Sequence, residues 1–266
     1  MPIETTAAWE ELSGVYTELV RDYHARLGHD PSSPEVERTV RTNTELVPRR
    51  ADNLLRVLGD AGGGGVEGRR VLEVGCGFGA LAAYLAWSAG PERVVAVDVR
   101  PEFVEAAASA AARLGLEERL SVRPGDMRDL DALGEEPFDV VVANNSFIYL
   151  PSARDMTQAL SQFRQALRPG GQLVFHHANP WRWRDPFSQD PLVHLLPAPL
   201  ATAVCRFTGW RHNHGRVKLV SAPRLAWMLR RAGFSAPTVV GAGKARNQRG
   251  LGRYFGGFYF VVARRG

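Results

Sequence analysis

Cysteine, lysine and long apolar runs are all scarce in this 266-residue sequence. Two cysteines, Cys76 and Cys205, are too few for a framework of disulfide bridges, so we expect a reduced, cytoplasmic setting. No apolar run approaches the roughly 18 residues that a membrane helix needs. The first residues show neither the basic nor the apolar segment of a signal peptide, so none is expected. These absences exclude a disulfide scaffold and predict no membrane span.

Acidic residues are nearly absent from the last part of the chain. Residues 163–266 hold 17 basic residues but only Asp185 and Asp190 as acids, a net charge of +15. Residues 1–162 hold 16 basic and 26 acidic residues, a net charge of −10, and the two values sum to the formal +5. This asymmetry indicates either a surface that meets an anion, nucleic acid or membrane, or two parts that neutralise each other within one fold.

The overall composition is ordinary for a globular protein, with 45% hydrophobic and 23% charged residues. Between about residues 70 and 175, short apolar runs alternate with helical patterns. We predict strands at 70–74, 93–97, 120–123, 138–143 and 172–177, and helices at 80–88, 102–114 and 152–167. A helix at 222–232 and strands at 238–240 and 258–263 follow. Strands separated by helices at this spacing predict βαβ units and an α/β fold with a mostly parallel sheet.

Two segments lie outside this alternation. Residues 1–60 are predicted to be helical, with breaks at 28–34 and near Pro48, and to form an N-terminal lid. Trp9, Tyr16 and Tyr23 recur every seven residues on one helix face, which either packs on the sheet domain or covers a ligand. The main domain is predicted at 61–266, with a cap insertion rich in proline and aromatic residues at about 179–220.

Three alternate glycines, Gly75, Gly77 and Gly79, separate an apolar strand from a helix. Glycine permits tight turns and close approach of a ligand, and the following helix offers free N–H groups. The spacing is not the G-x-G-x-x-G of a dinucleotide site, which disfavours a nicotinamide enzyme. The preceding acid, Glu73, would repel a pyrophosphate but suits an ammonium or sulfonium. Asp98, which ends the next strand, is placed to accept from both hydroxyls of a ribose.

With these motifs in order, residues from about 69 to 175 resemble the class I S-adenosylmethionine-dependent methyltransferases. The segments 125–127, 138–144 and 167–171 are similar to that family's later motifs. The resemblance implies a Rossmann-like, doubly wound, seven-stranded sheet whose last strand enters antiparallel, with S-adenosylmethionine as cofactor. It implies these cofactor-binding residues: Glu73, Gly75, Cys76, Gly77, Gly79, Asp98, Val99, Asp126, Met127 and Asn144.

The resemblance also implies roles within this set. Asp126 would accept a hydrogen bond from the exocyclic amine of adenine, Met127 would lie against the adenine ring, and Asn144 would lie near the methionine moiety. We expect Cys76 to be only a small turn residue, because no base near it in the sequence would make it a nucleophile.

Two histidines, His176 and His177, stand at the carboxyl end of a predicted strand, where open α/β sheets bind ligands. Neighbouring strand side chains face opposite ways, so one of the two is expected to reach the site. We favour His177 as a general base, since it is nearer the strand end; the alternative is that both are structural. No convincing set of metal ligands is present, and no metal is expected.

The acceptor site is expected above the carboxyl ends of the strands and under the cap insertion. Its candidate residues are Asn145, Phe147, Tyr149, Trp181, Arg182, Trp183, Arg184 and Arg211. The arginines suit a carboxylate or phosphate on the acceptor. Residues 144–147 lack the two prolines carried at this place by the methyltransferases that act on amino groups of nucleic-acid bases.

We therefore expect methylation of an oxygen or nitrogen of a small molecule, such as a natural product or a sugar. One alternative is an RNA-modifying methyltransferase, supported by arginine and aromatic residues interleaved over 246–255. Another is a non-catalytic module that binds S-adenosylmethionine and regulates a partner. The sequence does not distinguish the acceptor or the oligomeric state.

Overall fold

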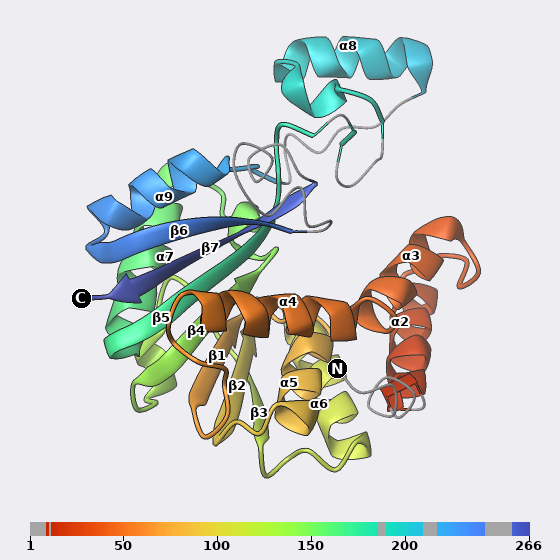
Figure 1. The fold of residues 1–266 in the computed structure, drawn as a ribbon. Coiled ribbons are helices and arrows are strands. Elements are labelled where there is room, and N and C mark those ends of the chain that lie inside the picture. The colour runs from red at the N-terminus through yellow and green to blue at the C-terminus, as the bar shows by residue number, and fades with distance from the viewer. Residues whose placement is uncertain (1–8, 11, 183, 186–189, 210–216, 243–256) are drawn as a thin grey trace.

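The computed structural model describes residues 9, 10, 12–182, 184, 185, 190–209, 217–242 and 257–266. Within these residues seven strands form one sheet in the order β3-β2-β1-β4-β5-β7-β6 (Figure 1). The strands are β1 (Arg70–Val74), β2 (Arg93–Asp98), β3 (Leu120–Pro124), β4 (Phe138–Asn144), β5 (Leu167–Ala178), β6 (Phe234–Ala242) and β7 (Phe258–Arg265).

Strands β1 to β5 pair in parallel, whereas β7 is antiparallel to both β5 and β6. This arrangement confirms the Rossmann-like, doubly wound, mostly parallel sheet with an antiparallel last strand. The α-helices are α2 (Gly14–Arg26), α3 (Pro34–Asn43), α4 (Val47–Asp60), α5 (Ala80–Ser88), α6 (Pro101–Arg113), α7 (Ala153–Ala166), α8 (Ala198–Thr208) and α9 (Ala222–Arg231). Short 3-10 helices occupy η1 (Asp131–Leu133), η2 (Phe147–Tyr149) and η3 (Val193–Leu195).

The sheet is buried on both faces. One apolar cluster joins one face of the sheet to α2, α4, α5 and α6, and a second joins the other face to α7 and α9. Side chains of each strand alternate between the clusters: Val174 belongs to the first, and Leu173 and Phe175 belong to the second. The continuous apolar runs in the sequence follow from this, because a parallel strand covered on both faces exposes neither set of side chains.

Most element ends match the sequence pattern closely, but two strands are longer than predicted: β6 runs from Phe234 to Ala242 where 238–240 was expected, and β5 starts earlier. Residues 167–171 lie before the predicted strand at 172–177, but they belong to β5 and pair irregularly beside Phe138 and Val140. Gly170 has φ +76°, a left-handed conformation that glycine adopts without steric cost. Ser152 caps α7 by accepting from the amide of Asp155 at 3.1 Å, whereas Ser221 stands before α9 without a side-chain capping bond.

The N-terminal helices pack against the sheet domain through the three aromatic residues spaced by seven. Trp9 and Tyr16 are fully buried, and the Trp9 ring lies edge-on to Tyr84 at 4.9 Å. The Tyr16 hydroxyl donates to the carbonyl of Gly79 at 3.4 Å, and Tyr23 meets Phe78 at 5.3 Å. The helical layer is therefore fixed to the loop that carries the glycine motif.

The segment after β5 carries η3 and α8, and Figure 1 shows α8 apart from the layers around the sheet. Several large apolar side chains of this segment are exposed, among them Leu195, Leu200 and Phe207. Among the described helices none is long and apolar enough to cross a membrane.

Candidate functional site

The glycine loop between β1 and α5 combines close packing with one open position. All three glycines have positive φ. A Cβ on Gly75 would lie 2.3 Å from Cβ of Ser146, and one on Gly79 would lie 2.7 Å from Cβ of Ala107. A Cβ on Gly77 would meet nothing within 4 Å. Packing within the protein therefore requires Gly75 and Gly79, and the space for a ligand opens at Gly77.

Asp98 holds this loop against the end of β2. Its side chain is buried; Oδ2 accepts from the amide of Gly77 at 2.9 Å, and Oδ1 accepts from the amide of Arg100 at 3.0 Å. A carboxylate has about four lone-pair positions, so each oxygen keeps capacity for a ribose hydroxyl. The next residue, Val99, is largely exposed.

Glu73 lies at the carboxyl end of β1 and is only 2% exposed. Burial raises its pKa to about 8, while the amide of Ala82 and the charge of Arg50 act in the opposite direction. Its Oε2 is buried and has no hydrogen-bond partner within the described residues. This one oxygen is thus an acceptor without a partner, and a nearby cation would stabilise the charged form of the carboxyl.

Cys76 turns its thiol to the carbonyl of Gly77 at 3.7 Å. Burial raises its pKa, and the charges of Glu73 and Asp98 add to the effect. A thiol with a raised pKa stays protonated and is a poor nucleophile. These surroundings are consistent with Cys76 being only a small residue in the turn.

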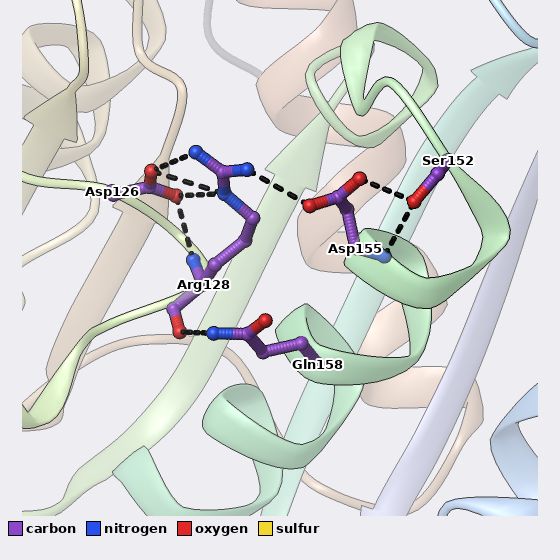
Figure 2. Close-up of polar contacts among 5 residues, drawn as sticks. All are labelled: Asp126, Arg128, Ser152, Asp155 and Gln158. Carbon is purple, nitrogen blue, oxygen red and sulfur yellow. Dashed lines mark hydrogen bonds and ion pairs between the residues drawn. The ribbon is translucent and has the colours of Figure 1, made fainter.

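Asp126 is engaged in a network that Figure 2 shows in full. Its oxygens accept from the Arg128 amide at 2.8 Å and from the Arg128 guanidinium at 2.6–3.0 Å. The same guanidinium reaches Asp155 at 2.8 Å, which Ser152 also contacts, and Gln158 donates to the Arg128 carbonyl at 2.9 Å. An adenine amine would therefore share the Asp126 carboxylate with Arg128. Met127, the next residue, has its Cε beside the backbone of Gly75.

His176 and Asn144 meet where β4 and β5 end. The His176 Nδ1 lies 2.9 Å from Oδ1 of Asn144, and the ring stacks on Phe258 at 5.2 Å and Phe260 at 4.5 Å. Burial lowers the pKa of His176 to about 3, with smaller contributions from the charges of Arg50 and His177. The ring is therefore neutral and fixed in orientation.

His177 faces the opposite side of the sheet. It is fully buried with its ring centroid 5.3 Å from that of Phe175 and 6.1 Å from that of Phe147. Within the described residues neither ring nitrogen has a hydrogen-bond partner. This environment does not favour His177, the histidine nearer the strand end, as the general base. His176, by contrast, shares its face of the sheet with Glu73.

We expect His177 to make the fold sensitive to acid. Burial lowers its pKa to about 3, so the neutral form stabilises the native state above the unfolded value of about 6.5, and this stabilisation is lost as the pH falls below it. Between pH 7.5 and 5 the loss amounts to about 2 kcal/mol. Denaturant unfolding should be measured for the wild type and His177→Phe at both pH values. Between them, the unfolding free energy of the wild type should fall by about 2 kcal/mol more than that of the variant. Equal losses would contradict a buried, neutral His177.

The residues after β4 differ in exposure. Asn145 has φ +54° and a buried Oδ1 without a partner in the described part of the chain. Phe147 is fully buried beside Phe163 and Phe175, so it packs in the core beneath the site. Tyr149 is 55% exposed.

In the cap, Arg182 places Cζ 5.6 Å from the ring centroid of Phe258, the residue that stacks on His176. Trp181 is exposed, and Arg184 is exposed within a β-bridge to Pro191. Trp183 and Arg211 lie outside the described residues. Among those described, no group of three histidine, cysteine or acidic side chains is arranged to hold a metal.

The structure adds residues that the sequence analysis did not select. Ser146 donates from Oγ to the carbonyl of Val74 at 2.6 Å and so ties the end of β4 to that of β1. Arg100 donates to the Tyr23 hydroxyl at 2.7 Å and lies over Phe103 at 4.4 Å, which links α2 to the turn after β2. Of these residues, only Tyr23 could have been selected from the sequence, because it is spaced by seven from the other aromatic residues of the N-terminal segment.

Comparison with known proteins identifies relatives of this chain in sequence and in fold. Residues 71–171 match the family described as a methyltransferase domain. Erythromycin 3''-O-methyltransferase of Saccharopolyspora erythraea is 33% identical over 125 residues, which are 47% of this chain and 40% of that protein. The O-methyltransferase cnsE of Penicillium expansum is 28% identical over 240 residues, or 90% of this chain and 75% of that protein. The chain thus matches less than half the length of the first relative.

Among solved structures, the N-methyltransferase NodS of Bradyrhizobium japonicum WM9, in complex with S-adenosyl-L-homocysteine, has the same fold. It aligns with a TM-score of 0.55 at 20% identity and covers 91% of this chain and 97% of its own. Fold and matched region together indicate a methyltransferase domain. The comparisons support a class I S-adenosylmethionine-dependent methyltransferase with S-adenosylmethionine as cofactor.

The described residues fit this cofactor at three points. The open position at Gly77 gives backbone access, the two oxygens of Asp98 match a ribose diol, and the unpartnered Oε2 of Glu73 matches an ammonium. The cofactor supplies a methyl group on a positively charged sulfur, which is an activated leaving group. The chain has to bind it, align the acceptor, and accept a proton where the acceptor carries one.

Proposed function

We propose that this protein transfers the cofactor's methyl group to a hydroxyl of a small natural product, with His176 taking the hydroxyl proton. The new bond joins acceptor oxygen to the methyl carbon as the carbon–sulfur bond breaks. The products are a methyl ether and S-adenosylhomocysteine, and the proton passes to Nε2 of His176. The names of the two curated relatives, both O-methyltransferases, support oxygen as the acceptor atom.

The observation that carries the proposal is the pairing of His176 with Asn144 at the carboxyl edge of the sheet. An amide oxygen accepts, so the contact at 2.9 Å places the ring proton on Nδ1 and leaves the Nε2 lone pair for an acceptor hydroxyl. The aromatic rings of Phe258 and Phe260 on the ring faces hold this orientation. A fixed, neutral imidazole is the form that general-base catalysis requires.

We further propose that Arg182 contacts an anionic group of the acceptor. Its guanidinium lies over Phe258, which in turn stacks on His176, so the cap approaches the proposed base at this point. Arginine binds carboxylates and phosphates through paired hydrogen bonds. Arg184 is more exposed and lies on the same segment of the cap, while Tyr149 and Trp181 supply exposed aromatic surface.

The test is methyl transfer from isotopically labelled S-adenosylmethionine to an acceptor panel. The panel holds glycosylated macrolides, phenols with and without a carboxylate, matched amines, and structured RNA. We expect label only in hydroxylated small molecules, with a mass increase of one methylene. Labelling confined to amines or RNA would overturn the proposal.

His176→Gln should lower kcat about 100-fold or more, the usual contribution of a general base, while leaving affinity for S-adenosylhomocysteine within a few-fold. His29→Gln, in the loop after α2, is the matched control and should retain wild-type kcat. Unchanged kcat in His176→Gln would remove the histidine from the mechanism and favour an acceptor that needs no base.

A further inference from the structure

Helix α8 of the cap presents an apolar face to solvent. Leu200, Val204 and Phe207 are spaced by four and three residues, which places them along one side of the helix; we call these three residues the cap face. Leu200 is 52% and Phe207 92% exposed, whereas Ala201 is the one buried residue of α8. Figure 1 shows α8 apart from the layers around the sheet, in agreement with this exposure.

The segment before α8 extends the apolar surface. The short helix η3 contacts α8 and carries Leu195, which is 49% exposed, and Leu192 just before it is 38% exposed. Large apolar side chains gathered at a surface are typical of an interaction site. The cap therefore has a surface suited to a partner with an apolar interior.

The charge at the surface of the cap is basic. The segment 179–220 contains six basic residues and two acids, Asp185 and Asp190. Asp185 is buried and Asp190 is half-buried. In the part of this segment that the structure describes, the exposed charged side chains are Arg184, Arg206 and Lys218.

The two acids lie away from the cap face. Burial raises the pKa of the Cys205 thiol, and the charges of Asp190 and Asp185 raise it further, so both carboxylates lie on the Cys205 side of α8. Cys205 is turned about 100–160° around the helix from the three residues of the cap face. Arg206, in contrast, directly precedes Phe207. The cap face thus combines apolar side chains with a neighbouring cation.

This combination favours one kind of partner. A nucleic acid would use the basic residues, but the aliphatic side chains of Leu195, Leu200 and Val204 offer no ring for base stacking. A second copy, cap against cap, would bring two sets of exposed arginines together without exposed acids in the described part of either cap. An anionic membrane satisfies both features, because acyl chains accept the apolar side chains and phosphates pair with the cations.

We propose that the cap docks peripherally on an anionic membrane surface, with Leu200, Val204 and Phe207 entering the lipid layer and Arg206 among the headgroup phosphates. Docked in this way, the cap would bring the carboxyl edge of the sheet close to the membrane. Cζ of Arg182 lies 5.6 Å from the ring centroid of Phe258, which stacks on His176. An amphiphilic acceptor held in the membrane surface would then reach the proposed base; this last step rests on the proposed function.

Vesicle sedimentation with the full-length protein is the test. The probes are vesicles of phosphatidylcholine alone and vesicles of phosphatidylcholine and phosphatidylglycerol in equal parts. The wild type should partition at least about tenfold more strongly onto the anionic vesicles, and added salt should reduce that preference because it screens the charges.

Substitutions separate the apolar and charged contributions. The double substitution Leu200→Ser with Phe207→Ser should weaken partitioning onto anionic vesicles about 10- to 100-fold, since two large apolar side chains no longer enter the membrane. Arg206→Gln should weaken it about fivefold, and on anionic vesicles only. Trp227→Ser is the matched control: Trp227 is 53% exposed beside Arg231 on α9, outside the cap, and its loss should leave partitioning unchanged. All variants should unfold at the wild-type temperature and bind S-adenosylhomocysteine as the wild type does.

Four results would overturn membrane docking. They are absence of wild-type binding to anionic vesicles, equal partitioning by the double variant, binding to RNA without binding to vesicles, and a wild-type dimer that the double variant converts to a monomer. The last two would assign the cap to nucleic acid or to a second copy. Failure of vesicle binding would leave methyl transfer to soluble acceptors standing, whereas vesicle binding without methyl transfer would leave membrane docking standing.

Discussion

Asp98→Ala is expected to weaken binding of S-adenosylhomocysteine by about 100-fold to 10,000-fold. Two charged hydrogen bonds to a ribose diol would be lost, each worth about 1.5–3 kcal/mol. The same substitution also removes the acceptor for the amides of Gly77 and Arg100, at 2.9 and 3.0 Å. The glycine loop would lose its tie to the end of β2, so a loss of preorganisation adds to the loss of direct contact.

Calorimetry and thermal unfolding separate the two contributions. Asp98→Asn keeps one acceptor oxygen and should fall between the wild type and Asp98→Ala in affinity. Glu102→Ala is the matched control: it removes an acid four residues away that is exposed and paired with Arg100. It should bind within about threefold of the wild type. If Asp98→Ala bound S-adenosylhomocysteine as tightly as Glu102→Ala, Asp98 would not contact the cofactor.

The sheet and the glycine loop were predictable because their causes are local. A strand buried on both faces requires a continuous apolar run, and a chain reversal with positive φ before a helix requires glycine. The sequence 70–98 contains both signals, and the observed β1 and α5 begin and end where the pattern predicts. Asp98 follows from the same logic, since it is the last residue of a parallel strand.

The side of the sheet that each histidine faces was not predictable from position alone. Adjacent residues alternate, but the phase depends on which helices cover each face. Phe175 and His177 share one face with α7 and α9, while Val174 and His176 share the other with α4. The sequence shows the alternation but does not assign a face to either residue.

Arg50 and Arg128 show a second limit. The chain is rich in arginine, so a single arginine in a helix or loop carries no signal of its own. Arg50 becomes informative only in the fold, where α4 packs against β5 and the Arg50 charge lowers the pKa values of both Glu73 and His176. Arg128, two positions along the chain, donates hydrogen bonds to the carboxylate of Asp126. A motif match to the segment 125–127 does not reveal this contact.

Glu73 gives the second large effect, a proton released when the cofactor binds. With a pKa of about 8 the group is mostly protonated at pH 7 in the free protein. An ammonium beside its unpartnered Oε2 would favour the charged form and lower the pKa. Binding of S-adenosylhomocysteine at pH 7 should therefore release close to one proton.

The proton is measured by calorimetry in buffers of different ionisation enthalpy. Glu73→Gln should release almost none and bind about 10- to 100-fold more weakly, since a charged contact becomes a neutral one. Binding of 5′-methylthioadenosine should release none in either protein. The absence of release by the wild type would mean that Glu73 stays neutral beside the ligand.

The unfolding free energy of the free protein provides an independent check with a fixed sign. A carboxyl whose folded pKa is raised stabilises the native state fully below its unfolded value of about 4.5, and this stabilisation is lost as the pH rises towards 8. Glu73→Gln has no such group, so relative to the wild type it should gain stability between pH 5 and pH 8. Saturation with S-adenosylhomocysteine should reverse that order at pH 8, because the ligand stabilises the ionised carboxylate of the wild type and has no equivalent partner in the variant. A buried acid that costs stability when empty and binds a cation when occupied accounts for both results.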